Sequence, residues 1–227
     1  MWNQILKLWH SDNLLDQSWE LSNQMFDISH EMFHESVRAL READHDKIDK
    51  EIRNKDIIIN KYEREVRRNV LTHLAVHGSE DIPAGLVLII VIIDIERIGD
   101  YTKNIVELVE AHGKTLDAGK YEKKLKKIEE AVQYVFDQTK SCLTESEKSI
   151  AMKLLLDYQW VNAECDKNLR KIIKQKDKNM DSGTAATLAM YMRYLKRIHS
   201  HLRNILTSVV NPFDRIGYKP KSTEELS

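Results

Sequence analysis

Chain-breaking residues are scarce in this sequence, which has only 7 glycines and 3 prolines among 227 residues. Glycine and proline disfavour the interior of a helix more than any other residues, so their scarcity predicts long helices. Cysteine is scarcer still, with only Cys142 and Cys165 and no CxxC spacing. This excludes a disulfide framework, and we interpret both residues as reduced thiols of a cytoplasmic protein.

Long apolar segments are also missing. The longest, Leu86 to Ile93, is far shorter than the roughly 20 residues that a membrane-spanning helix needs, and the first residues lack the pattern of a secretory signal. The formal net charge of -1 gives no overall attraction to nucleic acid or to an anionic membrane. Neither a glycine-rich phosphate loop nor a recognisable nucleophile is found. The sequence therefore predicts a protein that is not an enzyme, does not bind nucleic acid and does not span a membrane.

The sequence does contain apolar residues at helical spacing. They make up 42% of the chain, and Phe26, Phe33 and Leu40, for example, fall on one stripe. Pro83 suits the first turn of a helix, and Thr144 to Glu147 has the form of a capping box that would begin another. The fold is therefore predicted to be all-α. Its six long helices are expected over about 12–43, 44–77, 79–110, 121–142, 144–176 and 184–210.

The third and sixth of these stretches share a pattern. Arg97-Ile98 and Asn104-Ile105 recur with the same spacing as Arg197-Ile198 and Asn204-Ile205. This recurrence agrees with the order of the helices and predicts a duplication. We expect two tandem three-helix-bundle repeats followed by a polar tail, over 1–112, 113–218 and 219–227.

Two pairs of oxygen ligands stand out. Glu96 and Asp100 lie four residues apart, so both carboxylates project from one face of the third helix. Asp56 and Asn60 have the same spacing on the second helix. Packed together, these helices would present four side chains to a cation, with iron or zinc preferred and magnesium or calcium as alternatives. A second interpretation is that Glu96 pairs with Arg97 or with a lysine of a neighbouring helix.

The same segments carry a family resemblance. The run Asp94-Ile-Glu-Arg-Ile-Gly-Asp-Tyr-Thr-Lys-Asn-Ile-Val-Glu107 resembles the third bundle helix of the PhoU family, which has an LERIGDHAxNIAE-like stretch. Residues 52–63 are similar to the D-x-x-x-D segment of its second helix. The resemblance implies duplicated three-helix bundles that bind metal through E(D)xxxD pairs. It also implies a regulator that connects a phosphate transporter to a sensor kinase and restrains the phosphate-starvation response. A homodimer is left open.

The two repeats differ at the predicted ligands. Asn60 stands where the family often has a second acid. The second repeat has other residues at the four corresponding positions: Lys196 for Glu96, Ser200 for Asp100, Asn162 for Asp56 and Asp166 for Asn60. Since Lys196 brings a positive charge to the position of a ligand carboxylate, we expect no strong metal site in the second repeat, even though His199 and His201 lie nearby.

The sequence leaves two other functions open. His30-Glu31-Met32-Phe33-His34 is an HExxH motif, in which two histidines hold zinc and the glutamate activates water. The further glycine and histidine of the metzincin form would fall at Val37 and Leu40, and no strand precedes the motif to hold a peptide. Because the HExxH motif itself is complete, a zinc-dependent metallohydrolase that uses it remains an alternative. The other is a PhoU-like helical protein that stores metal or assists a transporter unrelated to phosphate.

Overall fold

The computed structural model describes residues 14–42, 48–77 and 79–220, and within these ranges the regular structure is entirely helical. The helices and short 3-10 turns are α2 (Leu14–Glu42), α3 (Ile48–His77), η2 (Ser79–Asp81), α4 (Ile82–His112), η3 (Gly119–Tyr121), α5 (Glu122–Glu145), α6 (Lys148–Asp157), α7 (Trp160–Ile173), α8 (Ser182–Val210) and η4 (Phe213–Arg215). In the described part of the chain, no helix combines the length and the apolar character needed to cross a membrane.

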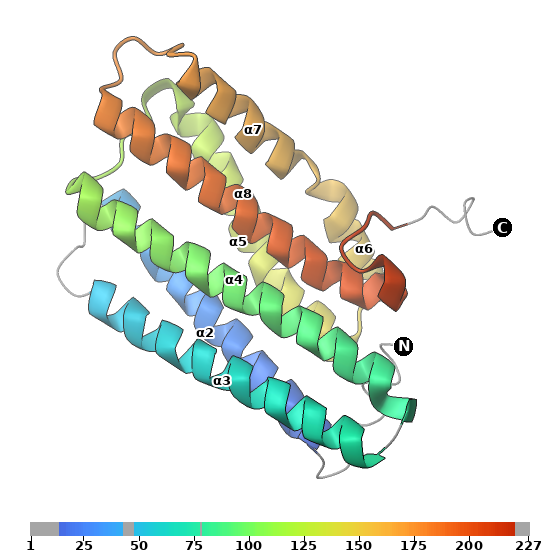
Figure 1. The fold of residues 1–227 in the computed structure, drawn as a ribbon. Coiled ribbons are helices and arrows are strands. Elements are labelled where there is room, and N and C mark those ends of the chain that lie inside the picture. Colours follow the sequence, from blue (N-terminus) through green and yellow to red (C-terminus); the bar gives the residue numbers. More distant parts are fainter. Residues whose placement is uncertain (1–13, 43–47, 78, 221–227) are drawn as a thin grey trace.

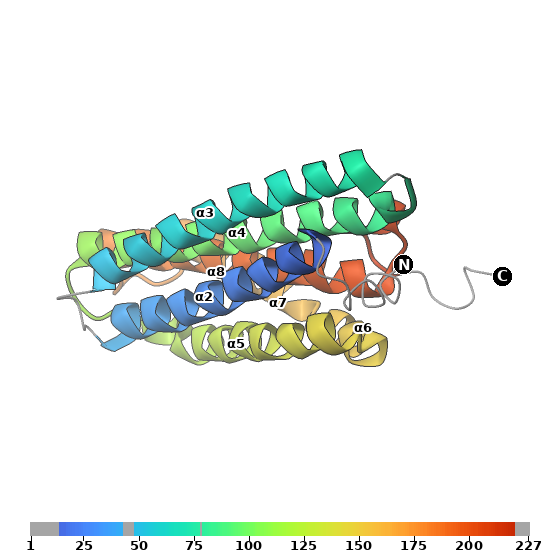
Figure 2. The same ribbon diagram turned by 90° about the horizontal axis from the view of Figure 1, so that it is seen from below.

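The helices form two bundles that lie side by side. Helices α2, α3 and α4 pack against one another, while α5, α6 and α7 each pack against α8. The bundles meet mainly along α4 and α8, which run antiparallel through the middle of the molecule (Figure 1). From below, α2 is seen next to α5 (Figure 2). This arrangement confirms the predicted fold class of an all-α protein with two three-helix bundles.

Several predicted helix ends are found where local chemistry favours them. Pro83 lies in the first turn of α4, and Gly113 ends that helix with a φ of 66°, its N–H bonding to the carbonyl of Val109. The carboxylate of Asp181 caps α8 by accepting a hydrogen bond from the backbone N–H of Thr184. Asn211 then ends α8 ahead of Pro212. The expected boundary between the first two helices, at residues 43 and 44, lies outside the described residues, as does residue 78, which follows the expected end of the second helix.

The predicted fifth helix is wrong in detail. The hydroxyl of Thr144 does not cap a new helix, because it donates to the carbonyl of Lys140 in the last turn of α5. The chain turns at Ser146, whose φ of 57° is left-handed, and α6 then begins at Lys148. A second interruption at Tyr158 separates α6 from α7. The stretch therefore forms two shorter helices that together occupy the place of one.

The apolar segment of α4, Leu86 to Ile93, is partly buried. Val87, Leu88, Val91 and Ile92 are buried. Leu86 is 40% exposed and Ile93 is 36% exposed, so one stripe of the helix reaches the surface. Helix α4 is central because it contacts α2 and α3 on one side and α8 on the other.

Polar side chains join α4 to α8 across this central contact. Asp94 is 7% exposed, and its Oδ1 lies 2.7 Å from His201 Nδ1 and 3.3 Å from Asn204 Nδ2. About two turns further along α4, the Tyr101 hydroxyl accepts a hydrogen bond of 3.0 Å from Arg197 Nε. Tyr101 lies opposite Tyr194, with 6.0 Å between the ring centroids. These contacts fix the register of the two helices.

A second polar link joins α2 to the other bundle. Tyr191 on α8 donates a hydrogen bond of 2.7 Å to Glu129 Oε1 on α5, and Arg41 Nε on α2 lies 3.4 Å from the same oxygen. Arg41 also pairs with Glu122.

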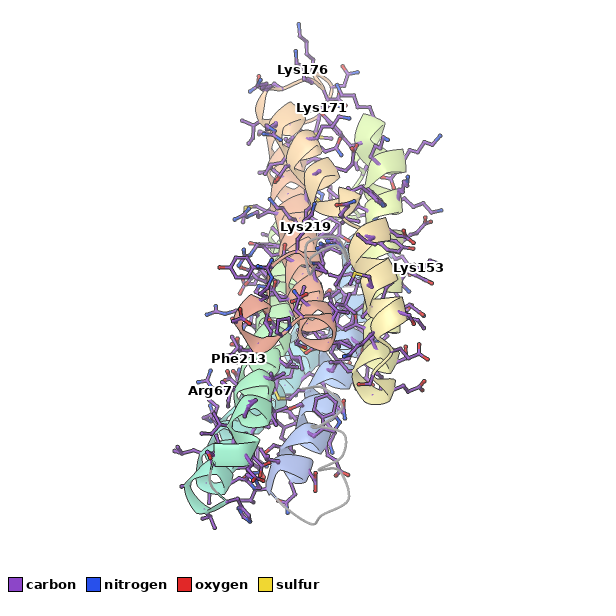
Figure 3. All side chains as sticks on the ribbon, turned by 90° about the vertical axis from the view of Figure 1, so that its right-hand side faces the viewer. Arg67, Lys153, Lys171, Lys176, Phe213 and Lys219 are labelled. Carbon is purple, nitrogen blue, oxygen red and sulfur yellow. The ribbon has the colours of Figure 1, made fainter. Side chains whose placement is uncertain are left out.

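Other basic residues are spread over the surface, with Lys171 and Lys176 at one end of the molecule and Arg67 toward the other (Figure 3).

Candidate metal centre between helices α3 and α4

The four predicted ligands lie along the contact between α3 and α4. Asp56 and Asn60 are on α3, where Asn60 Nδ2 donates a hydrogen bond of 3.2 Å to Asp56 Oδ2. Glu96 and Asp100 are one turn apart on α4. The side chains of Asp56 and Glu96 are only 14% and 20% exposed, so both carboxylates are largely removed from water.

Lys103 binds both aspartates of the set. Its Nζ lies 3.0 Å from Asp56 Oδ2 and 3.1 Å from Asp100 Oδ1, so the ammonium group links α3 to α4. Burial alone would lower the pKa of Lys103, but the hydrogen bonds to Asp56 and Asp100 raise it above its ordinary value. A positive charge already lies between two of the predicted ligands, as expected for carboxylates that are close together and partly buried.

Among the residues that the structure describes, Glu96 has no comparable partner. Its Oε2 lies 3.7 Å from Nε of the adjacent Arg97, whose side chain is 56% exposed, so the attraction is screened by water. Burial and the negative charges of Asp100 and Glu63 raise the pKa of Glu96 to about 6. A carboxylate in this state gains more from a nearby cation than an ordinary surface glutamate does.

Glu63 is an acidic neighbour that the sequence reasoning missed. It lies on α3 seven residues after Asp56, a spacing that returns to the same helix face, and it is 9% exposed. Its Oε1 accepts a hydrogen bond of 2.6 Å from Arg67 Nη2. The periodicity of α3 could have identified Glu63, whereas the position of Lys103 required the packing of the helices.

A glycine allows α3 and α4 to approach each other here. A Cβ atom added to Gly99 would lie 3.1 Å from Ile59 Cδ1 on α3 and 3.9 Å from Ser29 Oγ on α2. The missing side chain between Glu96 and Asp100 therefore leaves room for the two neighbouring helices. This explains in physical terms why glycine suits the middle of the Glu-Arg-Ile-Gly-Asp run.

The donor set suits a hard or borderline cation, since it consists of three carboxylates and one carboxamide. Neighbouring negative charges act on Glu96 there, since Asp100 and Glu63 add to the effect of burial in raising its pKa. The ligands are not yet gathered around one point. Within the described ranges, the one group of three His, Cys, Asp or Glu side chains with ligand atoms within 4.8 Å of one another lies elsewhere, on α2 and α5. A metal ion between α3 and α4 would have to take the place of the Lys103 ammonium.

The corresponding residues of the second bundle also meet, but they satisfy one another. Lys196 Nζ lies 2.7 Å from both carboxylate oxygens of Asp166. Asn162 donates a hydrogen bond of 3.0 Å to Ser200 Oγ, and its Oδ1 lies 2.8 Å from Nδ1 of the buried His199. Positions that carry unbalanced acids in the first bundle therefore carry an ion pair and neutral hydrogen bonds in the second.

The HExxH residues divide between two neighbours. His30 and His34 on α2 face α5, where Asp137 lies. Glu31 is 62% exposed and its Oε2 lies 3.5 Å from Lys55 Nζ on α3. In a metalloprotease the glutamate has to face the water bound to the zinc. Here its carboxylate is directed toward a different helix from the two histidines.

Comparison with known protein families gives a match within the first bundle. Residues 22–109, which include all four predicted ligands, match the model described as PhoU domain. The chain carries a PhoU domain. The predicted resemblance to the PhoU family is thereby confirmed. No curated protein matches the sequence closely enough to be informative.

Solved structures extend this likeness to the fold of both bundles. PhoU from Pseudomonas aeruginosa is 20% identical and superposes with a TM-score of 0.78, covering 86% of this chain and 95% of that one. The phosphate transport system regulatory protein PhoU from Streptococcus pneumoniae is 17% identical with a TM-score of 0.75, covering 91% and 97%. At these identities the comparison shows a shared fold, which reaches beyond the residues that the PhoU domain model matches.

Proposed function

We propose that this protein is a cytoplasmic regulatory adaptor of phosphate uptake and signalling that binds metal and acts by contacting other proteins. The observation that carries the proposal is the PhoU domain over residues 22–109. Support comes from the fold shared with the phosphate transport system regulatory protein of Streptococcus pneumoniae. The partners would be a phosphate transporter and its sensor kinase, and the effect would be negative regulation of transport and of the starvation response.

Metal binding is proposed for the first bundle, at Asp56, Asn60, Glu96 and Asp100. Their oxygen atoms suit iron or zinc, with magnesium and calcium as alternatives. A bound ion would supply positive charge to acids that Lys103 only partly neutralises. Side chains of α3 and α4 that bind the same ion would hold the two helices together, so metal binding would make the first bundle more rigid.

The proposed boundaries of the two repeats are 1–112 and 113–218, with a tail over 219–227.

Elemental analysis of purified protein tests the metal site. We expect the double variant Glu96→Gln/Asp100→Asn to contain less bound metal than the wild type, since it removes two carboxylates of the set. Asp166→Asn is the matched control, because Asp166 occupies the position of Asn60 in the second bundle and pairs with Lys196. Equal metal content in the double variant and the wild type would contradict the proposed site.

The regulatory role needs a separate test in the host organism. Deletion of the gene should switch on a phosphate-starvation reporter while phosphate is abundant, and the wild-type gene should restore repression. Complementation with Glu96→Gln/Asp100→Asn then shows whether regulation requires the acidic site. A reporter that does not respond to the deletion would favour a PhoU-like protein that serves another transporter or stores metal.

The structure gives no support to a metallohydrolase that uses the HExxH motif. Its glutamate would have to activate water, and Glu31 instead lies beside Lys55 at the surface. An adaptor needs no such group, since its output is a protein contact. Peptide hydrolysis that is lost in Glu31→Gln would overturn this choice.

A further inference from the structure

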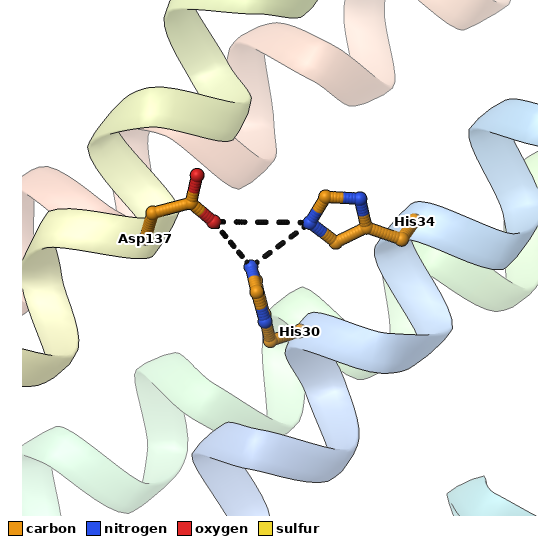
Figure 4. A group of neighbouring side chains, drawn as sticks. All are labelled: His30, His34 and Asp137. Atoms are coloured by element: carbon orange, nitrogen blue, oxygen red, sulfur yellow. Dashed lines mark hydrogen bonds and ion pairs between the residues drawn. The ribbon is translucent and has the colours of Figure 1, made fainter.

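Two histidines and an aspartate converge where the two bundles meet. His30 and His34 are one turn apart on α2, and Asp137 faces them from α5 (Figure 4). His30 Nε2 lies 2.6 Å from Asp137 Oδ1 and 3.0 Å from His34 Nε2. The third separation, from His34 Nε2 to Asp137 Oδ1, is 3.8 Å. All three donor atoms thus surround one point between the helices.

These separations match a tetrahedral metal site. Zinc binds histidine nitrogen and carboxylate oxygen at about 2.0–2.2 Å, which places neighbouring donors of a tetrahedron about 3.3 Å apart. The three separations here lie on both sides of that value. The spacing of the histidines, i and i+4 on one helix, is that used by zinc sites in other folds.

Both histidine rings pack against buried aromatic rings. The ring of His30 packs against Phe136 with 4.9 Å between centroids, and Phe136 in turn packs against Phe26 and Phe33. His34 contacts Phe33 at 6.1 Å. Because these phenylalanines are almost fully buried, the histidine rings rest on a rigid apolar surface. Such support lowers the conformational cost of gathering the ligands.

The opposite side of the cluster is open. The side chains of His30, His34 and Asp137 are 31%, 36% and 42% exposed, so a metal ion could enter and could take water as its fourth ligand. His34 also lines a groove of about 640 Å³ between α2 and α5. The groove gives the solvent-facing coordination position room for a ligand larger than water.

The donor set favours a borderline transition metal over magnesium or calcium, because two of its three atoms are imidazole nitrogens. We propose that His30, His34 and Asp137 bind Zn²⁺ and thereby clamp helix α2 of the first bundle to helix α5 of the second. The site is separate from the acidic set between α3 and α4 and does not depend on it. It uses both histidines of the HExxH motif, whereas Glu31 stays outside.

The test uses the full-length protein freed of metal. Titration with ZnCl₂ by calorimetry measures the affinity, and thermal unfolding with and without zinc measures the stabilisation that a ligand of the folded state produces. We expect His30→Gln/His34→Gln to weaken binding at least about 100-fold, since loss of an outer supporting residue alone costs 10–100-fold. The part of the rise in Tm that zinc produces through this site should be lost in the same variant.

A second variant guards against misfolding. Asp137→Asn keeps the shape of the side chain and removes the charged ligand, so it should fold normally and still lose zinc affinity. Absorption of the Co²⁺-loaded protein should show the visible bands of a tetrahedral site in the wild type and lose them in Asp137→Asn.

Three controls locate the effect. Glu31→Gln should bind zinc as the wild type does, since Glu31 lies beside Lys55. His77→Gln tests the other i,i+4 histidine pair, His73 and His77, in which His73 already pairs with Asp81 at 2.7 Å. Glu96→Gln/Asp100→Asn should retain the zinc effect, which separates this site from the acidic one. A wild type that binds no zinc, or unchanged affinity in both ligand variants, would overturn the proposal.

Discussion

Lys103 shows how one side chain can stand in for a bound ion. Its ammonium group lies within 3.1 Å of carboxylate oxygens on both α3 and α4. At the corresponding position the second bundle has Arg203, whose Nη1 donates instead to the backbone carbonyl of Leu155. In the first bundle, Lys103 therefore offsets the negative charges of Asp56 and Asp100. The second bundle does not need this, because Lys196 pairs with Asp166.

Replacing Lys103 should strengthen metal binding. In Lys103→Gln the carboxylates of Asp56 and Asp100 lose their ammonium partner, so a divalent cation no longer has to displace it. We expect about tenfold tighter binding, equivalent to about 1.4 kcal/mol, together with a lower Tm for the metal-free protein. Calorimetric titration of both proteins measures this. Lys61→Gln, an exposed change on α3, is the control. Weaker binding in Lys103→Gln would argue that Lys103 organises the site.

His199 makes the protein sensitive to acid. Burial, with a smaller contribution from Arg203, lowers the pKa of His199 to about 3, while the unfolded chain titrates near 6.5. Between these values the unfolded state binds a proton that the folded state does not bind, so stability falls as the pH falls. The loss from this group approaches about 1.4 kcal/mol per pH unit below pH 6.5.

Comparison of wild type and His199→Asn isolates this contribution. Urea unfolding at several pH values from about 4 to 7.5 should show a shallower loss of stability in the variant. The difference in slope is the measurement, because the substitution also changes the contact with Asn162. Parallel slopes would mean that His199 is not the titrating group.

At the level of the helix, the ends that are set by local backbone geometry could be predicted from the sequence, whereas the other ends could not. Pro83, Gly113 and Asn211 act through local geometry, so the sequence alone locates the ends of α4 and α8 to within a few residues. Thr144 has the right spacing for a cap, but its hydroxyl completes α5 instead. The interruption at Tyr158 involves neither glycine nor proline, and nothing local signals it.

The turn at Ser146 offers a stabilising substitution. Its φ of 57° is costly for a residue with a Cβ atom, and its hydroxyl is buried without a hydrogen-bond partner among the described residues. Ser146→Gly removes both costs, so we expect the free energy of unfolding to rise by about 1 kcal/mol.

A glycine inside a helix should have the opposite effect. Ser141 lies within α5, so Ser141→Gly should lower the free energy of unfolding by about 0.5–1 kcal/mol. Urea unfolding of the wild type and both variants gives the two signs in one experiment. If both glycines destabilise the protein, the conformation at Ser146 is not strained.

For the whole molecule, packing between bundles lies beyond sequence reasoning. The repeat of Arg-Ile and Asn-Ile pairs predicts which helices correspond, and the i,i+4 spacing places each pair of candidate ligands on one helix face. The sequence does not show which side chains meet across more than a hundred positions, as Asp94 and His201 do. Asp137 was missed as a partner of His30 and His34 for the same reason, since no local pattern joins α2 to α5.

The Arg41, Glu129 and Tyr191 network should be important for the joining of the bundles. Burial raises the pKa of Glu129, while Arg41 and the Tyr191 hydrogen bond oppose that change. Tyr191→Phe leaves the packing almost intact and removes a buried hydrogen bond to a charged acceptor, which costs about 1.5–3 kcal/mol. Urea unfolding measures the loss.

Tyr134→Phe is the matched control for Tyr191→Phe. The Tyr134 side chain is 46% exposed, so removal of its hydroxyl should change stability by no more than about 0.5 kcal/mol. Equal effects of the two changes would show that the hydroxyl of Tyr191 contributes nothing beyond an ordinary surface group.

The antiparallel contact of α4 with α8 has the geometry of a twofold axis within one chain. Exchanging each residue for its counterpart a hundred positions away converts the Asp94–His201 contact into the Tyr101–Tyr194 contact, and both are present. The two contacts lie seven residues apart on each helix, and the buried Ile98 and Ile198 lie about midway between them, next to the axis. The face of α4 that meets α8 is therefore close to self-complementary, as in the isologous interface of a symmetric dimer.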